Sequence, residues 1–364
     1  MKLKVLTLSL LWAVSATAQR QEIQLTQWQF SRDSVHWTHV TIPHDWAISG
    51  PFDKKWDLQC VAIEQNGETE ATEKSGRSGA LPWIGKGYYR TKVVVPSGFS
   101  HAELVFDGAM AEPVVKVNGK EAGGWKYGYN AFRVDVTSFM DSLQRAELDE
   151  QASAEHLQRY QAGQVAQEKS KKKGSGKSPK VYSDQVIDIE VSLQNVEESS
   201  RWYPGAGLYR PVKLLLTGAN GRRAYIDEWG TAIRVVSATE ERAVLDVTTE
   251  VRNYDGNPRT RVLFNILDAS GKPICDQEAA VSTDGKCHAE ITLSAPFHAD
   301  QLYLWSPETP YLYTFETMLF EEQEQVAQGQ ERAVVIFDKT SSRMGLRTVK
   351  VSREGGFELN GVSR

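Results

Sequence analysis

Cysteine is scarce in this sequence. The 364 residues contain three, Cys60, Cys275 and Cys287, which make a poor disulfide framework even in an oxidising compartment. Two of them lie in strand-like stretches on either side of Asp284-Gly285, a turn signal typical of a hairpin. In that hairpin register Cys275 and Cys287 do not face each other. We therefore predict free, mostly buried thiols.

Motifs for metal ions, nucleotides and activated serines are also missing. No C-x-x-C, H-E-x-x-H or His/Cys cluster occurs, so no metal site is predicted. No G-x-S-x-G elbow occurs either. His44 and Asp45 are sequence neighbours and would point to opposite faces of a strand, so we expect them to fix a loop rather than form a catalytic dyad. The G-S-G-K-S stretch at 174–178 has Lys171 where a P-loop needs its first glycine, which argues against nucleotide binding.

Charge of one sign is not in large excess. The formal net charge of −5 gives no basic footprint for nucleic acid or for an anionic membrane. The Lys-rich stretch at 170–180 has no aromatic residue for base stacking, so a solvated linker is favoured. Long apolar runs are lacking too, because Val5–Val14 is too short to span a membrane. With Lys2 and Lys4 before it and Ala16-Thr17-Ala18 after it, this run indicates a signal peptide, residues 1–18, and export to the periplasm or beyond.

What the sequence has in quantity is strand pattern. The 40% apolar and 10% aromatic residues suffice for packed cores, and the length favours two or three domains. Alternating apolar residues predict half-buried antiparallel strands. In the first half they are Leu104 and Phe106, Val115 and Val117, Phe132, Val134 and Val136, and Ile187, Ile189, Val191 and Leu193. Asn118-Gly119 predicts a type I′ hairpin turn. We predict one jelly-roll sandwich over residues 19–217.

The stretch 141–180 breaks this pattern. It is rich in Gln, Glu, Ala and Lys and ends as a basic Gly/Ser segment, so we interpret it as a helical or disordered surface insertion. A second set of alternating strands follows at Ala243–Val251, Val262–Ile266 and Ala289–Leu293. Their spacing predicts an immunoglobulin-like sandwich over residues 219–338. The remaining residues 339–364 are too short for a domain.

Catalytic carboxylates cannot be assigned from this pattern. Glycoside hydrolysis with retention needs two carboxyl groups about 5 Å apart on rigid elements. The acidic residues here fall mostly on solvent faces or in turns, and nothing marks a pair. The residues alone therefore predict an exported, all-β protein of two sandwiches.

Six phrases add a family resemblance because they occur in a fixed order. They are Val40–Trp46 (V-T-I-P-H-D-W), Gly87–Arg90 followed by Val93–Pro96, Phe106–Met110 followed by Val117–Gly119, Arg201–Arg210 (R-W-Y-P-G-A-G-L-Y-R), Trp305–Pro307 followed by Pro310–Tyr313, and Gly345–Arg347 followed by Gly356–Gly361. This series resembles glycoside hydrolase family 2, and the first and fourth phrases are most similar to its β-galactosidase branch. The resemblance covers nearly the whole chain after the signal peptide.

The resemblance implies a jelly-roll sugar-binding domain, an immunoglobulin-like domain and then a (β/α)₈ barrel. It also implies a retaining β-glycosidase whose acid/base and nucleophile are two Glu residues on that barrel. No residue here matches either Glu motif, so the expected catalytic pair lies beyond Arg364 and residues 339–364 would be the lead-in to the barrel. We expect no cofactor or metal in this chain and no hydrolysis by this chain alone. The expected partners are a β-galactoside and the barrel of the same polypeptide; a homo-oligomer is left open.

Two segments are candidates for contact with sugar or with the barrel. The resemblance implies that loops of the first domain reach the barrel mouth. The loop at 76–83 carries Arg77, which could reach a sugar hydroxyl, and Trp83; its glycines allow close approach to another surface. Arg201, Trp202 and Tyr203 form the second candidate. For both segments, packing against the barrel is favoured over direct contact with sugar.

Asp107 and Asn118, which lie within the family phrases, are expected to be turn and strand-end residues rather than ligands.

Two other functions are compatible with the same residues. A non-catalytic carbohydrate-binding module would hold sugar on the sandwich itself. A structural surface protein of tandem sandwiches would bind none. The ordered phrases favour the glycosidase.

Overall fold

The computed structural model describes residues 20–50, 83, 85–140, 185–195, 205–219, 222–295, 297–322 and 334–364. The predicted signal peptide at 1–18 and the predicted insertion at 141–180 lie outside these residues. The chain forms two compact units, Gln21–Leu216 and a second made of the segment up to Arg20 together with Thr217–Arg364. No α-helix occurs in the described residues, and none of their helical segments is long and apolar enough to cross a membrane.

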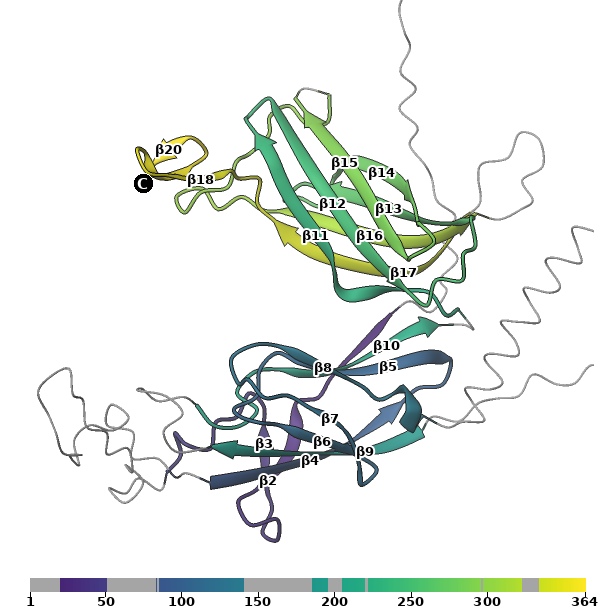
Figure 1. The fold of residues 1–364 in the computed structure, drawn as a ribbon, viewed down its shortest axis with the longest axis vertical. Coiled ribbons are helices and arrows are strands. Elements are labelled where there is room, and N and C mark those ends of the chain that lie inside the picture. Colours follow the sequence, from purple (N-terminus) through teal and green to yellow (C-terminus); the bar gives the residue numbers. More distant parts are fainter. Residues whose placement is uncertain are drawn as a thin grey trace, which may run out of the picture. The chain divides into compact units, whose positions relative to one another are not determined.

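The first unit is a sandwich of two antiparallel sheets (Figure 1). One sheet has the order β1-β10-β5-β8 and the other β3-β2-β4-β9-β6-β7. The strand bounds are β1 Gln21–Gln24, β2 Gln27–Ser31, β3 Thr38–Thr41, β4 Gly85–Val95, β5 Phe99–Phe106, β6 Val114–Val117, β7 Lys120–Gly124, β8 Phe132–Asp135, β9 Gln185–Asn195 and β10 Val212–Ala219. A short 3₁₀ turn, Thr137–Phe139, follows β8.

Alternation of side chains fixes the core of this unit. Strand β9 buries Ile187, Ile189, Val191 and Leu193, as their period of two predicts. Each such side chain, once fully buried, contributes about 1.5–3 kcal/mol to folding. Asn118 and Gly119 both have positive φ, at 51° and 75°, and join β6 to β7. This confirms the predicted hairpin, since a type I′ turn needs φ above zero at both positions.

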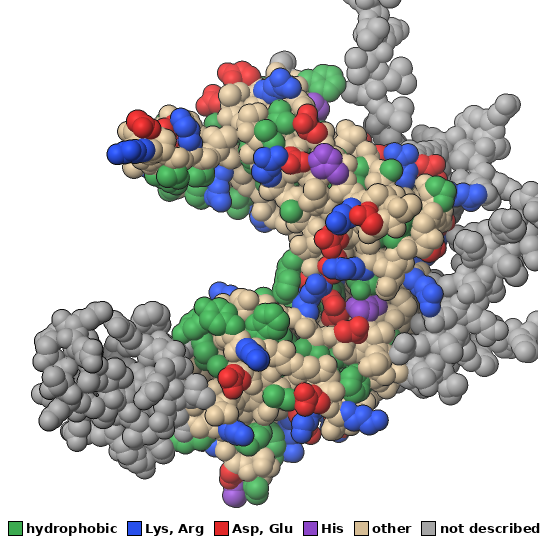
Figure 2. Space-filling model, in the orientation of Figure 1, with side chains coloured by type: hydrophobic (Ala, Val, Ile, Leu, Met, Phe, Trp, Pro, Cys, Tyr) green, Lys and Arg blue, Asp and Glu red, His purple; other side chains and the backbone are tan. Residues whose placement is uncertain are grey.

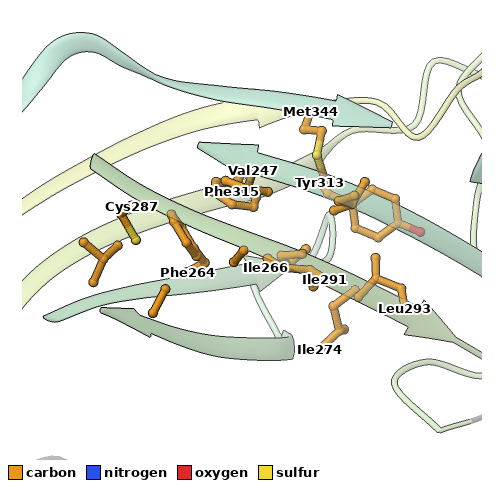
Figure 3. Close-up of a cluster of buried hydrophobic side chains, with 14 of the residues drawn as sticks. Val247, Phe264, Ile266, Ile274, Cys287, Ile291, Leu293, Tyr313, Phe315 and Met344 are labelled. Carbon is orange, nitrogen blue, oxygen red and sulfur yellow. The ribbon is translucent and has the colours of Figure 1, made fainter. Parts of the chain in front are cut away.

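The second unit is an immunoglobulin-like sandwich of seven strands. Its sheets have the orders β11-β12-β15 and β14-β13-β16-β17. The bounds are β11 Tyr225–Ala238, β12 Arg242–Arg252, β13 Thr260–Leu267, β14 Pro273–Ala280, β15 Lys286–Ser294, β16 Tyr313–Glu322 and β17 Val334–Met344. Figure 3 shows side chains of both sheets meeting between them, among them Val247, Phe264 and Phe315. The rings of Phe264 and Phe315 lie 5.7 Å apart between centroids.

One detail of this sandwich corrects the sequence analysis. A turn does form at Asp284-Gly285, with the Gly285 N–H donating to the Ser282 carbonyl, but it does not close a hairpin. Cys275 faces Ile266 of β13, whereas Cys287 faces Thr249 of β12, so β14 and β15 belong to different sheets. Turn chemistry specifies a chain reversal and leaves open which sheet receives the next strand.

The thiol prediction is confirmed for both of these cysteines. Cys287 is buried, Cys275 is half-buried, and both are free. Burial raises the pKa of each thiol to about 11. Cys60 lies outside the described residues.

After β17 the chain forms a small antiparallel sheet, β18-β19-β20. Its strands are Val349–Ser352, Gly356–Leu359 and Val362–Ser363. The all-β class, a jelly-roll sandwich followed by an immunoglobulin-like sandwich, is confirmed. The continuation into a (β/α)₈ barrel stays a prediction.

Candidate functional site

Two of the six sequence phrases meet at one end of the first unit. The backbone N–H of His44 donates to the Leu208 carbonyl at 2.8 Å, and that of Trp46 donates to the Ala206 carbonyl at 3.0 Å. The Asp45 carboxylate accepts the backbone N–H groups of Ala47 and Ala206, at 3.0 and 3.2 Å. This confirms that His44-Asp45 fixes a loop rather than forming a catalytic dyad.

The contact between these two segments requires Gly207. This residue has φ of 120°, and a Cβ there would lie 2.5 Å from the Tyr89 hydroxyl oxygen and 2.6 Å from the His44 carbonyl oxygen. No side chain fits at that distance. The second glycine of the G-A-G phrase is therefore explained by packing.

A cluster of aromatic rings lies beneath this loop. Phe30 stacks on Trp46, with ring centroids 5.4 Å apart and planes at 18°. Its ring centroid also lies 5.1 Å from that of His44 and 5.0 Å from that of Tyr89. Trp46 and Tyr89 are fully buried. A Cβ on Gly87 would lie 2.3 Å from the Trp46 ring, so the G-x-Y-R phrase also serves packing.

Trp83 is the one predicted site residue within the described part of the chain. It is half-buried, its ring lies 5.9 Å from that of Trp46, and the Arg32 guanidinium lies over it at 5.0 Å. These contacts attach Trp83 to the aromatic cluster. Its role toward sugar or barrel stays a prediction. Arg77, Arg201, Trp202 and Tyr203 lie outside the described residues.

Tyr89 and His44 share a hydrogen bond within the cluster. The Tyr89 hydroxyl lies 2.7 Å from Nδ1 of His44. Burial raises the pKa of Tyr89 well above its ordinary value, so the hydroxyl keeps its proton. Burial also lowers the pKa of His44 below its ordinary value; the nearby Asp45 charge opposes this and the Arg32 charge adds to it.

A pH dependence of stability follows from His44. Below about pH 6.5, the ordinary value, the unfolded chain takes up a proton that the folded chain resists. Falling pH therefore favours the unfolded state. We expect His44→Asn to flatten the decline in the free energy of unfolding between pH 7 and 5, measured by urea titration of the first unit.

His36 provides the matched control for this measurement. Its ring is exposed and bonds Asp33, which raises the pKa of His36. A raised pKa gives the opposite sign, with stabilisation present at low pH and lost as the pH rises through it. His36→Asn should therefore not flatten the acid decline. Equal slopes in the parent chain and in His44→Asn would contradict the assignment.

Asp107 and Asn118 take the structural positions expected of them. Asn118 Oδ1 accepts the backbone N–H of Asp188 at 2.9 Å next to the hairpin turn. Asp107 pairs through its backbone, its N–H donating to the Pro211 carbonyl at 3.1 Å. These contacts agree with turn and strand-end roles.

A second aromatic feature of the first unit was not identified from the sequence. Trp125, Tyr127 and Tyr129 are exposed on the loop between β7 and β8. Trp125 and Tyr127 line a groove of about 690 Å³ together with residues of β4, β6 and β9. The spacing W-x-Y-x-Y just after a hairpin strand was the available signal, because alternate positions of an extended segment share one face.

The buried carboxylates of the second unit have structural partners. Arg20 donates to Glu228 at 2.6 Å and to Asp338 at 3.2 Å, and all three side chains are less than one-tenth exposed. Carboxylates buried in this way are not accessible to flank a sugar. In the described residues no group of three or more His, Cys, Asp or Glu is arranged to hold a metal ion.

Comparison with known proteins shows which family this chain is similar to. Residues 224–334 match the family model described as glycosyl hydrolases family 2. The chain is 28% identical over 330 residues to the β-galactosidase BoGH2A of Bacteroides ovatus, a match that covers 89% of this chain and 30% of that protein. The chain is thus similar to glycoside hydrolase family 2 proteins over most of its length. The resemblance given by the six phrases is confirmed.

Solved structures share the fold of this chain. A glycosyl hydrolase family 2 member from Bacteroides cellulosilyticus is 21% identical with a TM-score of 0.64, covering 95% of this chain and 37% of that one. A β-glucuronidase of Bacteroides uniformis is 18% identical with a TM-score of 0.57, covering 94% of this chain and 34% of that one. The chain thus spans about a third of the length of each of these three proteins.

Proposed function

We propose that this chain supplies the two sandwich domains of an exported, retaining β-glycosidase that acts on β-galactosides. The observation that carries the proposal is the match to a β-galactosidase over 89% of this chain but 30% of that protein. The chemistry of the reaction also supports placing the catalytic carboxyl groups outside these two domains. A retaining glycosidase needs two accessible carboxyl groups about 5 Å apart, whereas the close carboxylates of Glu228 and Asp338 are buried against Arg20.

In this proposal the reacting carboxyls are supplied by a barrel of the same polypeptide. The strand ends of a (β/α)₈ barrel hold catalytic residues rigidly. The first unit would contribute loops at the barrel mouth, including Trp83 and the segments with Arg77 and Arg201–Tyr203. No cofactor is required for such hydrolysis, because two carboxyl groups supply both the acid and the nucleophile.

The test compares this chain with the polypeptide read past the codon for Arg364. Both would be expressed in a host without β-galactosidase and assayed on 4-nitrophenyl β-galactoside. We expect turnover by the longer polypeptide and none by the chain alone above host background. Turnover by the purified chain would overturn the assignment, as would a longer polypeptide without activity.

A β-glucuronidase is the second candidate, because the B. uniformis structure covers 94% of this chain. The same assay with 4-nitrophenyl β-glucuronide separates the two. A kcat/KM at least about tenfold higher for the galactoside supports our proposal, since a pocket built for one polar group discriminates strongly against its absence. The reverse preference would replace it.

Export is tested separately. Expression in a Gram-negative host followed by osmotic release should place the protein in the periplasmic fraction, with Gln19 as its first residue by mass spectrometry. Retention in the cytoplasm with Met1 intact would contradict export.

A further inference from the structure

The exposed Trp125 ring is held in a fixed orientation. It stacks on Phe132 with the planes at 3° and centroids 6.0 Å apart, and Phe132 stacks on Phe106 at 4.6 Å and 1°. Phe106 and Phe132 are buried in the sandwich, whereas Trp125 is 42% exposed. The indole N–H donates to Asn130 Oδ1 at 2.8 Å. The indole is thus held against the core at Phe132 while part of it stays accessible to a ligand.

The loop that carries this ring is anchored at two further points. The backbone N–H of Trp125 donates to the Pro113 carbonyl at 3.0 Å, and the Tyr209 hydroxyl donates to the Gly128 carbonyl at 2.7 Å. A Cβ on Gly128 would lie 2.3 Å from the Met110 sulfur, so the loop packs tightly there. A platform already ordered in the free protein loses little entropy on binding.

The groove beside the ring combines flat apolar surface with polar groups of both kinds. Its volume is about 690 Å³, within the range of small-molecule sites. Besides Trp125 and Tyr127, its lining includes the polar side chains of Lys86, Glu112, Lys126, Ser192 and Gln194. Figure 2 shows hydrophobic side chains gathered on the surface of the unit that carries β2 to β9.

We propose that this groove binds a short chain of β-linked pyranosides, with one sugar ring stacked on Trp125. A pyranose has an apolar C–H face for the indole and a rim of hydroxyls that both donate and accept. Lys86 and Lys126 supply donors, Glu112 supplies acceptors, and Ser192 and Gln194 supply both. Cations and a carboxylate together do not favour a polyanion such as nucleic acid.

The inference goes beyond the proposed hydrolase activity and does not depend on it. Binding here needs only the first unit, so a failed hydrolysis assay would leave it standing. Conversely, loss of the sugar site would leave the hydrolase proposal untouched. Galactosides and uronides share the stacking chemistry, and the test distinguishes them.

The test is calorimetric titration of the purified chain with β-linked galactotetraose, cellotetraose and a tetrauronide. We expect saturable binding to at least one, with Kd of about 10 μM to 1 mM. Trp125→Ala should weaken that binding at least about tenfold, and Trp125→Phe, which keeps a ring, by less. Trp229→Ala is the matched control, because Trp229 is 55% exposed in the other unit and should not affect binding.

Thermal unfolding would show that each variant is folded. If Trp125→Ala fails to fold, Tyr127→Ala replaces it, since Tyr127 is 59% exposed and lines the same groove. Absence of binding by all three sugars at about 10 mM would overturn the proposal. So would binding unchanged by Trp125→Ala; a lower melting temperature of the longer polypeptide in that variant would then identify the surface as a domain interface.

Discussion

Replacing Arg20 by alanine is expected to lower the free energy of unfolding of the immunoglobulin-like unit by about 3–5 kcal/mol. The Arg20 side chain is 6% exposed and bonds Glu228, both carboxylate oxygens of Asp338 and the Ile226 carbonyl. Removing the guanidinium leaves two buried carboxylates without their cation, which costs more than the net value of the ion pair. Hydrogen exchange of β11 and β17 peptides during a urea titration would measure the loss in this unit alone.

Two variants show whether burial is the cause. Arg20→Lys keeps the charge but not the fork that reaches both carboxylates, so an intermediate loss is expected. Arg234→Ala removes an arginine that bonds Asp246 but is 72% exposed, and should cost under about 1 kcal/mol. A loss for Arg20→Ala as small as that for Arg234→Ala would show that the cluster contributes little.

Replacing Phe264 by alanine is expected to destabilise the same unit by about 3–5 kcal/mol. Phe264 is fully buried and packs beside Phe315 of the neighbouring strand β16 in the core (Figure 3). The substitution removes apolar contacts and leaves a cavity that surrounding strands cannot close completely. The same urea titration would measure the change, and Phe264→Leu should lose less because most of the volume remains.

Phe297 is the matched control for this substitution. It is a phenylalanine of the same unit but 68% exposed, so Phe297→Ala should stay within about 0.5 kcal/mol of the parent. Similar losses at both positions would mean that ring removal acts through the unfolded chain and not through the core.

Strand faces could be predicted from the sequence because they depend on local alternation. In β12, Ala243, Leu245, Val247, Thr249 and Val251 are buried as predicted, and their neighbours are more exposed. A period of two needs no knowledge of the partner strand. The type I′ turn at Asn118-Gly119 was predictable for the same reason, since both residues tolerate positive φ.

Partners distant in sequence could not be predicted. Arg20 and Asp338 are 318 positions apart, and no local pattern indicates that one will bury against the other. The Asp284-Gly285 turn failed as a hairpin for a related reason. Its residues specify a reversal, but the next strand pairs with β12 of the opposite sheet.

In the candidate site, too, one residue could be predicted from the sequence and another could not. Trp83 was singled out because the family resemblance implies that loops of the first domain reach the barrel mouth, and its position beside Trp46 agrees with a packed loop. Trp125 was not singled out, because its exposed face depends on Phe106 and Phe132, which are buried in β5 and β8. Which aromatic rings remain accessible is decided by the assembled sandwich.

The two free cysteines can act as separate reporters of strand opening. Cys275 lies in β14 and Cys287 in β15, and each of these strands is the edge of its own sheet. With pKa values of about 11, roughly one thiol in ten thousand is ionised at pH 7, so alkylation should wait for detachment of the strand. In a Cys60→Ser background, the two labelling rates would show which of the two edge strands, β14 or β15, detaches from the immunoglobulin-like sandwich first.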